Sequence, residues 1–387
     1  MTTVTGDWLT HAATQRVMAM LEKGGHRAYA VGGCVRNALL GVPVTDVDIA
    51  TDARPERVVD LAEGAGLKAV PTGIDHGTIT VVAEGEGFEV TTFRADVETD
   101  GRRAVIRYAD RIEDDAIRRD FTINALYADR RGGLVDPLGG LPDLHARRLR
   151  FIADADTRIR EDYLRILRFF RFSAWYGDPA QGMDADALAA IAANLEGLHT
   201  LSRERVGAEV KKLLSAPDPV MAVSVMERTG VLQAILPGAT ARALGPLLSH
   251  EAALGLGADP IRRLAALGFA DGPALRLSKA DQARLDLFQR WVPDAAGLAE
   301  IAWRDGAERA QDLAVLRAAL LESPLFPDLT QRIARGAGAR FPVKAADLMP
   351  GLQGKALGDA LKDLEARWIA SDFTLTREAL LKGLAKG

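Results

Sequence analysis

Two aspartates two residues apart, Asp46 and Asp48, are spaced in a way that suggests chemistry. They lie in VTDVDIAT (44–51), whose apolar and β-branched residues are typical of a strand. Successive side chains of a strand point to opposite faces, so we expect both carboxylates on one face and Val47 and Ile49 in the core. Two carboxylates this close repel each other unless a positive charge lies between them. A divalent metal would supply that charge, although exposed edge strands also carry such residues.

A glycine pair, Gly32 and Gly33, precedes the aspartates within 17 residues. It ends an expected strand (28–33) and opens an expected helix (35–41) closed by glycine. Such a turn leaves backbone N–H groups free at a helix N-terminus, which suits a phosphate, or it is simply a tight turn. Glycines and aspartates together predict a phosphate cradle beside a carboxylate pair, as two-metal phosphoryl transfer requires. Glu89, on an expected neighbouring strand, is either a third carboxylate or a solvated residue.

The stretch RRDFTINAL (118–126) adds cations and a polar pair. Arg118 and Arg119 could bind triphosphate oxygens, or they are ordinary surface residues. Asp120 and Asn124 are four residues apart, which would place them on one face of a helix.

The stretch EDYLRILRFFRF (161–172) has apolar residues at helical spacing. Asp162 and Arg165 are three apart and would share a helix face, which Arg168 continues. From spacing alone, a surface ion pair is the favoured interpretation.

The surrounding elements predict an α+β protein. Residues 1–145 alternate between strand and helix signals, including a helix that opens with proline at 55 and a hairpin of strands 77–84 and 88–94. The polar, glycine-punctuated segment 97–108 predicts a loop. After about residue 155 strand signals disappear, and apolar residues recur at helical spacing.

Composition narrows the class of protein. A chain of 387 residues, 48% hydrophobic and 26% charged, predicts a globular protein of more than one domain. The single cysteine excludes an internal disulfide and a cysteine-cluster zinc site. There is no run of 18 apolar residues and no signal pattern at the start, so we expect a cytoplasmic protein without a membrane partner.

Charge gives only a local indication of nucleic-acid binding, because the formal net charge is −4. Residues 102–171 hold 16 Arg and no Lys against 12 Asp and Glu. Arginine suits bidentate contacts with phosphates and bases, but genomic codon preference would also explain the excess.

Taken in order, VGGCVRNALLG, DVDIAT, RRDFTINAL, DPLGG and EDYLRILRFFRF resemble the class II tRNA nucleotidyltransferase and bacterial poly(A) polymerase family, within the DNA polymerase β superfamily. The resemblance covers about residues 28–215. It implies a nucleotidyltransferase head with a mixed β-sheet over 1–145 and an all-helical neck with a base-reading helix over 146–215. A helical body and tail over 216–387 would bind RNA, holding the 3′ acceptor end of tRNA.

The resemblance also implies roles for individual residues. Catalysis would involve Mg²⁺ held by Asp46 and Asp48, with Glu89 beside them. The implied nucleotide-binding residues are Gly32, Gly33, Arg36, Arg118 and Arg119 for the triphosphate, Asp120 and Asn124 near the sugar and phosphates, and Asp162, Arg165 and Arg168 on the helix that reads the base.

Two departures from the family pattern stand out. The family usually has Asp where this chain has Asn37, which puts the role of that charge in doubt. None of the six histidines is followed by Asp, so we expect no His-Asp phosphohydrolase domain.

Several functions stay open. The favoured one is template-independent addition or repair of the tRNA CCA end from CTP and ATP, because LSRERVGAEVKKLL (201–214) resembles the CCA-adding type. A poly(A) polymerase shares the catalytic motifs, and CC-adding or A-adding specialists are possible. A small-molecule nucleotidyltransferase would not need the long helical region. A catalytically inactive RNA-binding protein would not need the aspartate pair. No obligate protein partner is expected.

Overall fold

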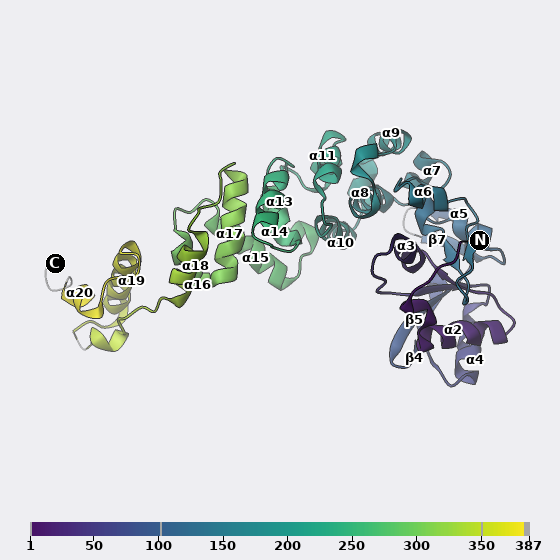
Figure 1. Ribbon diagram of the computed structural model, residues 1–387, viewed down its shortest axis with the longest axis horizontal. Coiled ribbons are helices and arrows are strands. Elements are labelled where there is room, and N and C mark those ends of the chain that lie inside the picture. The colour runs from purple at the N-terminus through teal and green to yellow at the C-terminus, as the bar shows by residue number, and fades with distance from the viewer. Residues whose placement is uncertain (1, 101–102, 350, 383–387) are drawn as a thin grey trace. The chain divides into compact units, whose positions relative to one another are not determined.

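The computed structural model describes residues 2–100, 103–349 and 351–382. The chain forms two compact units, Met1–Pro237 and Gly238–Gly387 (Figure 1). The finer boundaries at residues 145 and 215 stay predictions. Within the described residues, no helix has the length and apolar character needed to cross a membrane.

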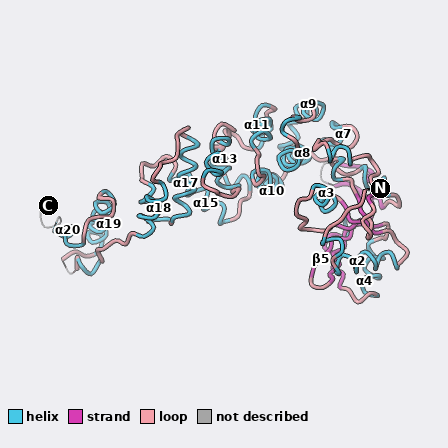
Figure 2. The backbone as a smooth tube through the Cα atoms, in the orientation of Figure 1, coloured by secondary structure: helices cyan, strands magenta, loops and turns pink. Residues whose placement is uncertain are grey.

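The first unit contains a seven-stranded sheet in the order β3-β4-β5-β2-β1-β8-β9, where Figure 2 shows the strands gathered. β2 pairs with β5 in parallel and the other neighbours are antiparallel, which confirms the predicted mixed sheet. The strands are β1 (Ala28–Val31), β2 (Asp48–Thr51), β3 (Lys68–Gly73), β4 (Thr78–Ala83), β5 (Glu86–Thr92), β8 (Tyr127–Ala128) and β9 (Leu134–Val135).

Both faces of the sheet are covered. Ile49 of β2 joins one buried cluster with apolar residues of α2 (Ala12–Lys23) and α4 (Pro55–Gly64), whereas the next residue, Ala50, joins a second cluster with Phe93. This alternation follows from the two-residue period of a strand. The expected helix after the glycine pair is α3 (Gly33–Leu40), which ends at Gly41 in the left-handed conformation.

The predicted loop over 97–108 is wrong. β6 (Arg94–Asp100) and β7 (Arg103–Tyr108) pair in an antiparallel hairpin, and residues 101 and 102 lie outside the described residues. The polar and charged residues there suggested a loop, but a two-stranded ribbon satisfies its backbone groups by pairing and does not need an apolar face. The expected hairpin of β4 and β5 is confirmed.

Helices follow the sheet, and the described residues after β9 contain no further strand, as predicted. The remaining elements of the first unit are α1 (Asp7–Thr10), η1 (Ile74–His76), α5 (Ile112–Ile117), η2 (Thr122–Asn124), α6 (Leu141–His145), α7 (Ala155–Glu161), α8 (Leu164–Tyr176), η3 (Pro179–Gln181), α9 (Ala185–Ala193), η4 (Leu195–Thr200), α10 (Arg203–Leu214), α11 (Val220–Arg228) and α12 (Val231–Ile235). Where one helix was expected over 161–172, the chain breaks at Asp162 between α7 and α8.

The second unit consists of helices in the described residues: α13 (Leu244–Ala253), α14 (Pro260–Ala266), η5 (Gly272–Leu275), α15 (Lys279–Trp291), α16 (Leu298–Asp305), α17 (Ala307–Leu320), α18 (Leu329–Gly338), η6 (Ala345–Asp347), α19 (Gly354–Ala370) and α20 (Arg377–Lys382).

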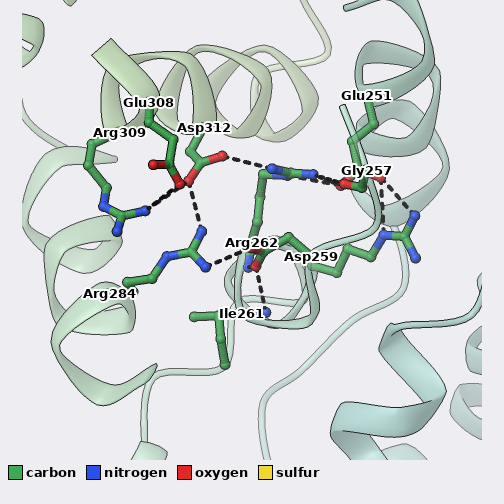
Figure 3. Close-up of polar contacts among 10 residues, drawn as sticks. Glu251, Gly257, Asp259, Ile261, Arg262, Arg284, Glu308, Arg309 and Asp312 are labelled. Atoms are coloured by element: carbon green, nitrogen blue, oxygen red, sulfur yellow. Dashed lines mark hydrogen bonds and ion pairs between the residues drawn. The ribbon is translucent and has the colours of Figure 1, made fainter. Parts of the chain in front are cut away.

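A charged network joins four of these helices (Figure 3). Arg262 of α14 contacts Glu251 of α13 at 2.8 Å and Asp312 of α17 at 2.7 Å, and all three side chains are buried. Arg284 of α15 contacts Asp312 at 2.8 Å, and Arg263 contacts Glu251 at 2.8 Å. Buried charges are tolerated only when they are paired and hydrogen-bonded, as these are.

Candidate active site

Two carboxylates meet where β2 and β5 run side by side. Asp48, the first residue of β2, lies directly opposite Glu89 of β5 in the parallel register. Asp46 lies two residues earlier, in an irregular segment before the strand, so the prediction that both aspartates lie on one face of a single strand is wrong. The reason is that ladder pairing of β2 begins only at Asp48. All three carboxylates nevertheless line one cleft of about 720 Å³, with Trp8 and His11 among its other lining residues.

The charges in this cleft are unbalanced. Loss of hydration and the negative charges of Glu89 and Asp46 raise the pKa of Asp48, and only partial relief comes from Arg119. A carboxylate whose neighbours oppose its ionisation is one that a cation would stabilise.

The donor set fits a metal ion shared with a substrate. In the described part of the chain, no three His, Cys, Asp or Glu side chains are arranged to enclose a metal. Magnesium in phosphoryl-transfer sites characteristically takes one or two carboxylates and completes its shell with substrate phosphates and water. Asp46 and Asp48 meet that requirement.

The N-terminus of α3 lies beside Asp48. Burial raises the pKa of the thiol of Cys34, the second residue of this helix, and Cys34 is near enough to Asp48 for that carboxylate to help raise it. The buried thiol donates to the Val31 carbonyl at 3.4 Å. Gly32, before the helix, has a φ of 72°, a conformation that favours glycine. The first turn of a helix has N–H groups without helical partners, so the predicted phosphate cradle is adjacent to the carboxylates.

Arg118 and Arg119 are both held by a buried aspartate. Asp115 of α5 contacts Arg118 at 2.7 Å and Arg119 at 2.9 Å, and it accepts a hydrogen bond from the Tyr127 hydroxyl at 2.8 Å. A Cβ built on Gly32 would lie 3.5 Å from Nη1 of Arg119, so this guanidinium closes one side of the cradle. Sequence reasoning missed Asp115, although its spacing of three and four residues from the arginines was a usable signal.

Arg36 is buried and already has several partners. Its guanidinium donates to Asn124 at 2.5 Å, to Asn37 at 2.9 Å and to the Tyr176 hydroxyl at 2.8 Å. It also lies over the Tyr176 ring, 3.9 Å from the centroid. These contacts join α3 to α8, and a contact of Arg36 with a triphosphate stays a prediction.

Asp120 and Asn124 come together, but not on an α-helix. Asp120 precedes the short 3₁₀ helix η2, which contains Asn124, so the expected α-helical face is wrong. The turn still lets the Asn124 amide donate to Asp120 at 3.0 Å. Arg168 of α8 contacts the other oxygen of Asp120 at 2.6 Å.

Asp162 and Arg165 are placed by separate partners. Asp162 lies in the break before α8, not on a helix face with Arg165, and it contacts Arg205 of α10 at 2.6 Å. Arg165 contacts Glu161 at 2.5 Å and donates to the Arg118 carbonyl at 3.1 Å. The i,i+3 helical pairing was therefore wrong, and the sequence reading missed the partners Glu161 and Arg205.

Known proteins resemble this chain in sequence and in fold. The family described as Poly A polymerase head domain matches residues 28–150, and the family described as Probable RNA and SrmB-binding site of polymerase A matches residues 182–242. A CCA-adding enzyme of Geobacillus thermodenitrificans is 33% identical over 383 residues, which is 95% of this chain and 92% of that protein. The chain belongs to the CCA-adding enzyme family.

Other members of the family are similar over different lengths. A mitochondrial CCA tRNA nucleotidyltransferase 1 of Mus musculus is 43% identical over 51% of this chain and 45% of its own length. The crystal structure of the Bacillus stearothermophilus CCA-adding enzyme with CTP has a TM-score of 0.71 at 27% identity, covering 93% of both chains. A Thermotoga maritima CCA-adding enzyme complexed with tRNA shares the fold, with a TM-score of 0.70 at 18% identity over 99% of this chain and 98% of that one. Nucleotidyltransferases of this family depend on divalent metal.

Proposed function

We propose that this protein adds or repairs the 3′-terminal CCA of tRNA, using CTP and ATP without a nucleic-acid template. The observation that carries the proposal is the similarity to a CCA-adding enzyme over nearly the full length of both chains. The alternative, a poly(A) polymerase, shares the head domain but is not the name carried by these relatives.

Mg²⁺ is the proposed ion, with Asp46 and Asp48 as its ligands and Glu89 beside them. When bound, it would neutralise charge on the triphosphate and favour attack by the RNA 3′ hydroxyl. The protein's own part is to orient the nucleotide: N–H groups at the start of α3 and the guanidinium of Arg119 would bind phosphate oxygens.

Base choice would come from Asp162 and Arg165. Cytosine and adenine both present an amino donor beside a bare ring nitrogen, whereas guanine and uracil present a carbonyl beside a ring N–H. A carboxylate only accepts and a guanidinium only donates, so the pair complements C and A and opposes G and U. The contacts to Arg205 and Glu161 support this role because they hold each group in one orientation.

We also propose a role for each region of the chain. The head would span 1–145 and the neck 146–215, with 216–387 binding the acceptor end of tRNA in the cytoplasm. The match of residues 182–242 to an RNA-binding family supports the RNA contact.

The test supplies purified protein with tRNA lacking its last three nucleotides, CTP, ATP and Mg²⁺, and sequences the products. We expect addition of C, C and A, followed by a stop. Long adenosine tails on generic RNA without use of CTP would contradict the proposal and favour poly(A) polymerase.

A further inference from the structure

The segment that carries Asp46 is irregular and exposed, so its position depends on a few attachments. Residues 42–47 connect α3 to β2 without regular secondary structure. At the start of this segment, the Val42 N–H donates to the Asn37 carbonyl at 3.0 Å, which completes the end of α3. Near its end, the Thr45 hydroxyl donates to Asp46 at 2.9 Å, and β2 begins two residues later.

The side chain of Asn37 makes a second attachment to the same segment. Its amide nitrogen donates to the Pro43 carbonyl at 2.9 Å. Its amide oxygen accepts from the Arg36 guanidinium at 2.9 Å and 3.2 Å. Both neighbours fix the orientation of the amide, because a carbonyl can only accept and a guanidinium can only donate.

This bond connects the segment to the nucleotide-binding residues. Arg36 donates to Asn124, and Asn124 donates to Asp120, at 2.5 Å and 3.0 Å. A continuous set of hydrogen bonds thus runs from the Pro43 carbonyl, through Asn37, to a buried aspartate.

We infer that Asn37 is a positioning residue for the metal carboxylates: its amide N–H holds residues 42–47 so that Asp46 stays beside Asp48. An aspartate at this position could still accept from Arg36. It could not donate to Pro43, and it would place a carboxylate oxygen against a carbonyl oxygen. The amide therefore makes a contact with this backbone that a carboxylate at the same position cannot make. The inference rests on the proposed function, because it assigns Asp46 and Asp48 to a metal.

The first measurement is hydrogen exchange of the Val42 N–H, which donates to the Asn37 carbonyl at the start of this segment, in the protein without metal or nucleotide. Asn37→Asp removes the donor while keeping the size, and Asn37→Ala removes it without adding charge. In both variants the Val42 N–H should exchange about twofold to twelvefold faster, the factor expected when the segment loses one hydrogen bond. Unchanged exchange in either variant would overturn the inference.

The second measurement is the metal concentration that gives half-maximal nucleotide incorporation. It should rise severalfold in Asn37→Ala, with kcat at saturating metal less affected. If Asn37→Asp changed the metal requirement and Asn37→Ala did not, the added charge and not the lost hydrogen bond would be responsible, and the inference would be wrong.

Gln289→Glu is the control. The Gln289 side-chain amide also donates to a backbone carbonyl, that of Ala270 at 2.7 Å, and it lies outside the site. The substitution should leave exchange at Val42 and the metal requirement unchanged. Effects equal to those of the Asn37 variants would mean that any lost amide contact loosens the protein, and would overturn the inference. Failure of the proposed function would appear separately, as wild-type protein that does not incorporate C and A on truncated tRNA.

Discussion

The negative charge of Asp48 is disfavoured by burial and by its neighbours Glu89 and Asp46. The proposed reaction nevertheless requires it. Replacing Asp48 with Asn keeps its shape and removes the repulsion from Glu89 and Asp46. We expect incorporation at saturating metal to fall by about 10³-fold or more, because the proposed Mg²⁺ would lose one of its proposed ligands. Thermal unfolding should occur at an equal or higher temperature, because the repulsion is relieved.

The control for Asp48→Asn is Asp60→Asn, at an exposed position of α4. It should change neither activity nor stability appreciably. Near wild-type incorporation by Asp48→Asn would show that the metal assignment is wrong.

At the same scale, Asp162 and Arg165 should govern base choice. Replacing both with Ala removes the acceptor and the donor that oppose G and U. Because a buried mispaired polar group costs about 1–3 kcal/mol, the preference for C and A over G and U should fall by about 10-fold to 100-fold. Steady-state incorporation of all four nucleotides measures this.

Arg160→Ala is the comparison for that experiment, since Arg160 is an exposed residue of α7 that contacts Asp156 at 3.1 Å. It should keep the wild-type preference. An unchanged preference in the double variant would mean that other groups read the base.

Among the elements, the junction of α5 and β8 depends on ionised Asp115. Burial alone would raise the pKa of Asp115, but the guanidiniums of Arg119 and Arg118 lower it to about 2. A lowered pKa stabilises the fold above the ordinary value near 4, and that stability is lost as the pH falls from about 4 to about 2. The contribution is about 2 kcal/mol.

Asp115→Asn isolates this effect. It should be less stable than wild type at pH 7, because the two arginines lose their partner. The difference in the free energy of unfolding should narrow by about 2 kcal/mol as the pH is lowered to about 2. Urea unfolding at several pH values measures it, and a difference independent of pH would show that Asp115 is not the titrating group.

Elements also show how far the sequence could predict this site. Strands, helices and glycine turns of the head were predictable because period-two patterns, caps and turn residues act locally. The break at Asp162 was not, because the flanking residues keep helical spacing and the extended conformation depends on a contact with Arg205 from another helix. Asp115 was missed although its arginine partners are only three and four residues away, whereas Arg36 contacts Asn124, which only folding brings close.

At the scale of the whole molecule, the buried charged network is expected to contribute to the stability of the second unit. Arg262→Met removes the charge between Glu251 and Asp312 and leaves both carboxylates with fewer partners. Breaking a buried ion pair in this way costs about 3–5 kcal/mol. We expect a lower unfolding temperature by calorimetry.

Arg332→Met in the same unit is the control, because Arg332 contacts Asp328 at 2.8 Å with both side chains largely exposed. Exposed pairs contribute about 0–1 kcal/mol, so its unfolding temperature should change little. Equal effects of the two substitutions would mean that the network adds no special stability.

Labelling of Cys34, the only cysteine in the sequence, can report the rate at which the first unit opens. Cys34 is buried beside Asp48, and burial raises its pKa to about 11, so at pH 8 only about one thiol in a thousand is in the reactive form. A thiol reagent should therefore modify the native protein only when this unit opens. Asp115→Asn should speed labelling, and bound nucleotide should slow it. The rate of Cys34 labelling would then report how often the first unit opens, whereas a calorimetric signal combines both units of the chain.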